Sequence, residues 1–155
     1  MRTPFRVAVA TVALVAIGAA ESLASARGLA EQAARGRPAL APAGTLLTLA
    51  GLALSVGVYL GLGRAVARAG GTERRALVEG VVTGALAGAL GGTVRALAVS
   101  DYLGEQVARF GLPVAFLVAA LVAFVLLAVL GSTAGGGALA WLGHRLTIGT
   151  RRPET

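Results

Sequence analysis

Apolar residues fill four long stretches of the chain, and short polar segments separate them. The stretches cover residues 5–23, 45–63, 76–98 and about 113–130. Each is close to the roughly 20 apolar residues that an α-helix needs to cross the hydrocarbon layer of a bilayer. The pattern therefore predicts an all-α fold, an integral membrane bundle of four transmembrane helices over about residues 4–26, 45–68, 73–98 and 113–143. Together they form a single transmembrane domain over residues 1–155, with a basic C-terminal tail at 145–155.

Helix-breaking and capping residues set the ends of these helices. Residues 27–43 are predicted to form a short helical stalk and a loop, because Pro38 and Pro42 interrupt a helix there. Gly70-Gly71 followed by Thr72 and Glu73 predicts a tight antiparallel hairpin, with Thr72 as the N-cap of the third helix. The segment from residue 100 to 110 mixes apolar with charged residues, which predicts a short interfacial helix between the third and fourth helices.

Two segments leave alternatives open. The first apolar stretch also fits a secretory signal peptide, since Arg2 and Arg6 precede it and Ala24-Ser25-Ala26 matches a cleavage site. The fourth stretch is longer than one membrane crossing, so its helix either continues through residues 131–137 or breaks at the glycines there. We favour a continuous helix, because small residues are common in membrane helices.

Glycine recurs at every fourth position of the third stretch, which places a smooth face along one side of the predicted helix. In lipid, small residues at this spacing let a neighbouring backbone approach closely. Pairs at the same spacing in the second and fourth helices, 51/55, 57/61 and 131/135, are candidate partners, and packing within the chain is favoured over dimerisation. The predicted helix-packing residues are Gly80, Gly84, Gly88, Gly92, Gly131 and Gly135.

Composition and charge agree with a lipid environment. Hydrophobic residues make up 56% of the 155 positions and charged residues 14%, whereas soluble domains carry about 25% charged residues. The net charge of +7 would favour nucleic-acid binding in a soluble protein. Here the 14 basic residues, all arginines, cluster beside the apolar stretches, so we expect them to contact the anionic headgroups of membrane lipids and expect no nucleic acid as a partner.

The arginines also predict an orientation. With four spans, nine of them fall on the side of the termini and five on the other side. The positive-inside rule then places both termini in the cytoplasm, in a multi-pass protein of the inner membrane.

Ionisable residues within membrane spans are costly and are functional candidates by default. Four occur at matching depths of the first and third helices, which run in the same direction. We expect Arg6 to pair with Glu79 near the inner side and Glu21 with Arg95 near the outer side. A local contact between Glu79 and Arg75, four residues earlier, is the alternative for that carboxylate.

Other candidate chemistry is sparse. The chain has no Cys and one His. His144 lies beside Trp141 and Arg145, where we expect an interfacial polar residue and no metal ligand. Ser132 and Thr133 have no base or oxyanion partner in the same segment. We therefore expect no enzyme, no cofactor and no metal.

The fragment from Gly88 to Arg95, with the sequence GALGGTVR, resembles the glycine-rich opening helix of small four-helix fluoride channels. It covers about a twentieth of the chain and lies in the third span instead of the first, and the chain lacks the membrane Asn of that family. No function is carried over from it. The sequence favours a structural or accessory membrane component packed through small-residue faces, alone as a homo-oligomer or within a larger membrane complex. The alternative is a small homo-oligomeric channel or transporter, with a lipid-modifying enzyme as a third candidate.

Overall fold

The computed structural model describes residues 3–35 and 42–149, and the side chains of residues 4–24 and 46–149. Four α-helices make up the described part: α1 (Thr3–Arg35), α2 (Pro42–Arg68), α3 (Glu73–Arg109) and α4 (Val114–Gly149). The predicted all-α fold of four long helices is confirmed.

All four helices are long and apolar enough to cross a membrane. The most apolar is α4, in which mean hydropathy reaches 3.0. Large apolar side chains are exposed on the outside of every helix, and Leu127 on α4 is 69% exposed. Because exposed apolar area of this extent is unfavourable in water, the chain is a small multi-pass membrane protein.

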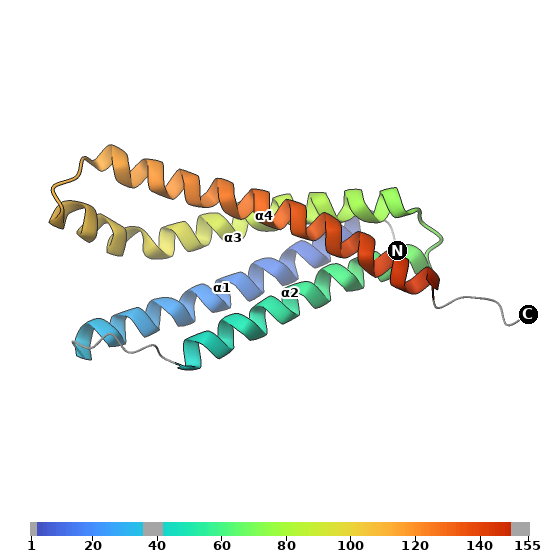
Figure 1. Ribbon diagram of the computed structural model, residues 1–155, viewed down its shortest axis with the longest axis horizontal. Helices are drawn as coiled ribbons and strands as arrows, with labels where there is room; N and C mark the ends of the chain where they lie inside the picture. The colour runs from blue at the N-terminus through green and yellow to red at the C-terminus, as the bar shows by residue number, and fades with distance from the viewer. Residues whose placement is uncertain (1–2, 36–41, 150–155) are drawn as a thin grey trace, which may run out of the picture.

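The helices form two antiparallel hairpins, α1 with α2 and α3 with α4 (Figure 1). The first turns of α1 and the last turns of α4 lie at the same end of the bundle. The two hairpins pack against each other near that end and diverge toward the other, so the molecule is V-shaped in this view (Figure 1). The contact between α3 and α4 is the most extensive, and α1 packs on α3 while α2 packs on α4.

The turn between α2 and α3 has the predicted construction. Gly70 adopts a φ of +72°, a conformation that favours glycine, and the Gly71 N–H donates to the Val66 carbonyl 2.9 Å away. The Thr72 hydroxyl accepts a hydrogen bond from the Arg75 N–H at 3.3 Å. Thr72 is therefore the N-cap, as predicted, with Glu73 in the first turn of α3.

The structure differs from the sequence prediction between α3 and α4. The segment predicted as a separate interfacial helix forms the last turns of α3, which continues unbroken to Arg109. Charged residues do not by themselves interrupt the hydrogen bonds of a helix. The helical backbone stops only just before Gly111, which adopts a φ of +65°. The separate interfacial helix is therefore not confirmed.

Other helix ends also extend beyond their predicted limits. The continuation of α1 past the membrane stretch as a stalk is confirmed, because the helix runs to Arg35. The predicted continuity of α4 through residues 131–137 is also confirmed. The predicted basic tail is wrong at its start, because α4 includes Arg145 and ends at Gly149. Residues 150–155 of that tail and the loop at 36–41 lie outside the described residues.

Candidate functional site

The glycine row of α3 lies directly against the backbone of α4. A Cβ added at Gly80 would overlap the carbonyl of Gly136, and one at Gly84 would overlap the carbonyl of Ser132. At Gly88 a Cβ would lie 2.8 Å from the Ala128 carbonyl oxygen. All three glycines are buried. Any larger residue at these three positions would therefore push α3 away from α4.

The fourth member of the row makes a looser contact. A Cβ at Gly92 would lie 3.0 Å from the Ala128 Cβ and 3.6 Å from the Val125 Cα. The α3–α4 approach is thus closest at Gly84 and loosens through Gly88 to Gly92.

On α4 the glycines that contact α3 are shifted by one position from the predicted pair. Gly131 and Gly135 have open space where a Cβ would lie. Gly136 and Gly137 instead face α3, the latter with the Val81 side chain 2.9 Å from its Cβ position. Because one residue corresponds to a rotation of about 100° around a helix, the contacting face of α4 is the one centred on Ser132 and Gly136.

A second close backbone contact joins α2 to α4, and it was not predicted from the sequence. A Cβ at Gly63 would overlap the Ala140 carbonyl, and one at Gly143 would overlap the Leu60 carbonyl. Of the predicted candidates on α2, Gly57 and Gly61 have open space, and Gly51 lies against the Glu21 side chain of α1. Spacing alone could not identify Gly63 and Gly143, because the two glycines lie on different helices and pair only once the helices cross.

The charged residues predicted near the inner side lie at the end where the hairpins meet. Glu79 is 3% exposed and its carboxylate accepts from Arg75 Nε at 3.0 Å, one turn earlier in α3. Arg6 Nη1 donates to the Ala65 carbonyl of α2 at 3.2 Å. The structure thus gives Glu79 the local ion pair that was the alternative, and it directs Arg6 to α2.

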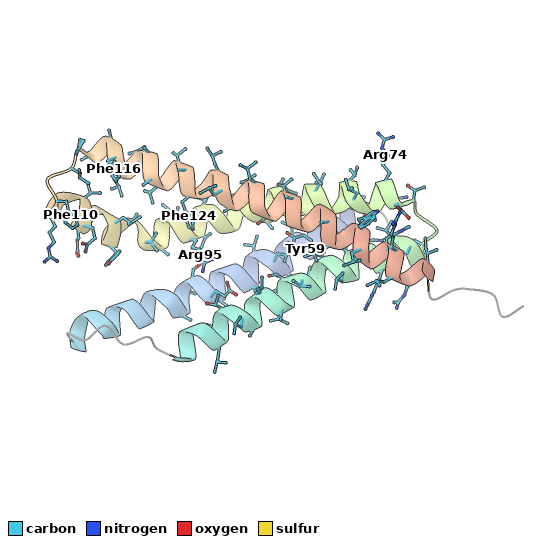
Figure 2. The ribbon with its side chains drawn as sticks, viewed as in Figure 1. Tyr59, Arg74, Arg95, Phe110, Phe116 and Phe124 are labelled. Carbon is cyan, nitrogen blue, oxygen red and sulfur yellow. The ribbon has the colours of Figure 1, made fainter. Side chains whose placement is uncertain are left out.

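The outer pair is arranged differently from the prediction. Glu21 packs over α2, where its carboxylate occupies the space beside Gly51. Arg95 is half-buried and lies between the two hairpins (Figure 2). Among the described side chains, no ion pair joins Glu21 to Arg95.

Polar contacts fasten the C-terminal turns of α4 to the start of α3. Glu73 accepts from Trp141 Nε1 at 3.0 Å and from Arg145 Nε at 3.2 Å. The Arg145 guanidinium lies 4.4 Å from the centroid of the Trp141 ring. His144 is 1% exposed, so it is buried between helices beside the α2–α3 turn. Its Nε2 lies 2.8 Å from the Gly71 carbonyl oxygen and donates to it.

Where the hairpins begin to diverge, residues of all four helices line a pocket of about 210 Å³. Most of its wall is formed by small or apolar residues, four of which belong to α3. One cation and three hydroxyls supply its polar groups. These are Arg95 of α3, Ser55 and Tyr59 of α2, and Ser132 of α4. The remaining lining residues are Leu14, Gly18, Ala87, Gly88, Gly91, Gly92, Phe124 and Ala128.

Sequence reasoning found only part of this pocket. Arg95 was a candidate because it is charged within a span, whereas Tyr59 and Ser55 gave no such signal. Tyr59 is 6% exposed, and its ring packs against Gly136, whose Cβ position lies 2.6 Å from the Tyr59 Cε1 atom. A buried tyrosine beside a glycine of another helix could be recognised only after the crossing of α2 and α4 was known.

The described residues offer a restricted chemistry. None of their His, Asp and Glu side chains forms a group of three that could hold a metal ion. The polar groups of the pocket are instead a guanidinium and neutral hydroxyls, which can hold an anion by charge and hydrogen bonds. Comparison with protein-family models, with curated proteins and with solved structures found no match.

Proposed function

We propose that the protein is a structural or accessory component of a membrane assembly. The observation that carries this proposal is the close backbone contact of α3 with α4 at Gly80, Gly84 and Gly88. Two helices in contact through their backbones form a stiff hairpin, because neither can shift without losing many dispersion contacts. A stiff hairpin with a large apolar outer surface suits a protein that supports or orients other membrane helices.

The inner-side polar groups support the same role. The contacts of Glu73 with Trp141 and Arg145, and of His144 with Gly71, join helix ends to one another. These groups are therefore used for holding the bundle together, and the proposal assigns them no catalytic activity, cofactor or metal.

The proposed location is the inner membrane, with both termini in the cytoplasm. Its support is the arginine-rich end of the bundle, where the helix ends beside the α2–α3 turn carry Arg64 and Arg68 on α2 and Arg74 and Arg75 on α3. Arg74 points away from the bundle (Figure 2), a direction in which it can reach anionic lipid headgroups. The proposed partners are these lipids, and a second copy of the chain or a larger membrane complex.

A second candidate function is a small homo-oligomeric channel or transporter. The specific observation in its favour is the pocket between the hairpins, which contains a cation and three hydroxyls within the apolar span. Polar groups facing a cavity at membrane depth are typical of transport pathways. The pocket is confined to one level of the bundle, which makes this the second candidate.

Purification from native membranes separates the two functions. The full chain, tagged at its C-terminus, is extracted with a mild non-ionic detergent, and its mass and co-purifying proteins are measured. We expect a stoichiometric partner larger than this 15.3 kDa chain. A pure homo-oligomer that passes ions after reconstitution into liposomes would contradict the accessory role and support the second candidate.

A double variant tests which outer surface of the chain binds the co-purifying partner. Leu127 and Leu130 on α4 are 69% and 66% exposed, so replacing both with Ala removes apolar contact area from the outer surface without touching the α3–α4 contact. If α4 carries the partner interface, this double variant retains less partner than the wild type at equal expression. The corresponding Ala variant of the exposed Leu46 and Leu49 on α2 serves as the control.

A further inference from the structure

Arg95 is a cation well inside the apolar length of the bundle. Gly92, one turn earlier, contacts Val125 and Ala128 of α4. Arg95 therefore lies level with Phe124, which lines the same pocket. Beyond this level α4 continues for about ten further apolar residues, or roughly 15 Å at the rise of an α-helix. A charge at this depth is costly unless something compensates it.

The described residues provide no compensating group. No hydrogen bond or ion pair to the Arg95 guanidinium comes from any described side chain or carbonyl. The nearest acidic candidate from the sequence, Glu21, packs against Gly51 of α2 instead. Side chains of an α-helix lean toward its N-terminus, which for α3 directs Arg95 toward Gly91 and Gly92 and into the pocket.

Three hydroxyls share the pocket with this cation, and they also lack partners. Tyr59 is buried, at 6% exposed, yet its hydroxyl has no hydrogen bond with any described residue. The same holds for the hydroxyls of Ser55 and Ser132. Ser55, Ser132 and Arg95 are half-buried, so the hydroxyls and the guanidinium open onto the pocket with their hydrogen-bonding capacity unused. Hydrogen bonds to a charged group contribute more than those between neutral groups, so a polar ligand in this space would be stabilised.

The donors determine the chemistry of the ligand. A guanidinium offers five N–H donors in a planar fork that matches the oxygens of carboxylate or phosphate groups, and the hydroxyls add three more donors. This number exceeds what the two oxygens of a carboxylate accept and suits a phosphate group, which carries four oxygens around phosphorus, two of them ester oxygens in a phosphodiester. The pocket, at about 210 Å³, is smaller than the roughly 300 Å³ at which drug-sized sites begin.

We propose that this pocket binds a phosphate group, held by the Arg95 guanidinium and the hydroxyls of Tyr59, Ser55 and Ser132. The phosphate has two sources with the same chemistry: inorganic phosphate from the aqueous phase, or the phosphodiester of an acidic lipid that enters where the hairpins diverge. The site does not depend on either proposed function, because an accessory protein and a transporter can both hold a phosphate there.

The first experiment uses inorganic phosphate as the probe. The full chain in non-ionic detergent is titrated with sodium phosphate at constant ionic strength, maintained with sodium chloride, and binding is measured by calorimetry and by the melting temperature. We expect saturable binding and a rise in melting temperature. Arg95→Gln should weaken binding about tenfold or more, since it removes charge-assisted hydrogen bonds.

Two further variants keep the result interpretable. Arg74→Gln removes the same charge from the same helix, but at an exposed position outside the pocket, so its binding should equal that of the wild type. Tyr59→Phe removes one hydroxyl and preserves the ring that packs on Gly136, so it should fold and bind several-fold more weakly. If Arg95→Gln fails to fold, the phosphate binding of Tyr59→Phe tests the site in its place.

The second experiment tests the lipid source. The protein is reconstituted into nanodiscs of phosphatidylcholine with or without phosphatidylglycerol, released into the gas phase, and the retained lipids are counted by native mass spectrometry. Retention of phosphatidylglycerol by the wild type and by Arg74→Gln, but not by Arg95→Gln, identifies the lipid as the source. Binding of inorganic phosphate alone identifies the free anion, and both results support the site.

The proposal is overturned by either of two results. One is that neither probe binds the wild type saturably. The other is that Arg95→Gln and Arg74→Gln lose binding equally, because the attraction would then come from the overall charge of the protein surface. Neither result bears on the purification experiment above, so the site and the proposed function can fail separately.

Discussion

At the scale of single residues, the bundle depends on glycines at which backbone atoms of another helix occupy the space that a Cβ would take. Gly84 and Gly131 show the contrast. A Cβ at Gly84 would meet the Ser132 backbone, which cannot move aside, whereas a Cβ at Gly131 would meet open space. Both residues belong to four-residue glycine spacings, so only the structure distinguishes them.

We predict that Gly84→Ala destabilises the protein and that Gly131→Ala does not. Overpacking of a close contact costs about 1–3 kcal/mol, which should lower the melting temperature of Gly84→Ala in detergent. Gly131→Ala should melt at or slightly above the wild-type temperature, because alanine favours the helix. Equal melting temperatures for the two variants would show that the glycine row does not position α3.

Some of the residues that matter could be predicted from the sequence, and others could not. Arg95 could be identified from the sequence because a charge within an apolar stretch is conspicuous. Tyr59 could not, because its importance comes from its contact with Gly136 on another helix. The choice between Gly131 and Gly136 on α4 likewise depends on helix rotation, which a run of small residues leaves undetermined.

At the scale of elements, turn chemistry was more informative than composition. The α2–α3 turn was predicted correctly, because Gly70, Gly71 and Thr72 have defined backbone and capping preferences. The separate interfacial helix was not confirmed, because its prediction rested on mixed polarity, and mixed polarity does not end a helix. Between residues 73 and 109 no proline interrupts α3, and this feature explains its full length.

The α2–α3 turn is also held from outside, by His144 of α4. We predict that His144→Ala loosens this turn, because it removes both the hydrogen bond to the Gly71 carbonyl and a side chain that is 1% exposed. The combined cost of the cavity and the hydrogen bond is about 2–4 kcal/mol. Limited trypsin digestion of the full chain should then cut faster after Arg68 and Arg74.

The control for this variant is Leu146→Ala. Leu146 lies two residues from His144 on the same helix and is 48% exposed, so its loss should leave the trypsin rate unchanged. If both variants are cut at the wild-type rate, the contact between His144 and Gly71 does not restrain the turn.

At the scale of the whole molecule, backbone contacts hold together one part of the bundle and leave another part open. The α3–α4 and α2–α4 contacts at Gly80, Gly84, Gly63 and Gly143 are concentrated toward the end that contains the α2–α3 turn. The hairpins diverge toward the opposite end (Figure 1), and Arg95 lies between them in the open part (Figure 2). The number of helices and the membrane setting follow from hydropathy alone, whereas this uneven packing follows from contacts between distant residues.

The central claim is that the α3 glycine face packs on α4 of the same chain within the membrane. Disulfide cross-linking tests it most directly, because the chain has no Cys of its own. A Cβ at Gly92 lies 3.0 Å from the Ala128 Cβ, slightly closer than the roughly 3.5–4.5 Å of a disulfide, so a small adjustment allows the bond. The measurement is oxidation in native membranes of Gly92→Cys combined with Ala128→Cys, and of Gly92→Cys combined with Gly131→Cys as the control.

The account predicts a cross-link within one chain for the first pair and none for the second. The single variant Gly92→Cys should form no dimer. Equal cross-linking of both pairs, or dimers from the single variant, would contradict the packing of α3 on α4.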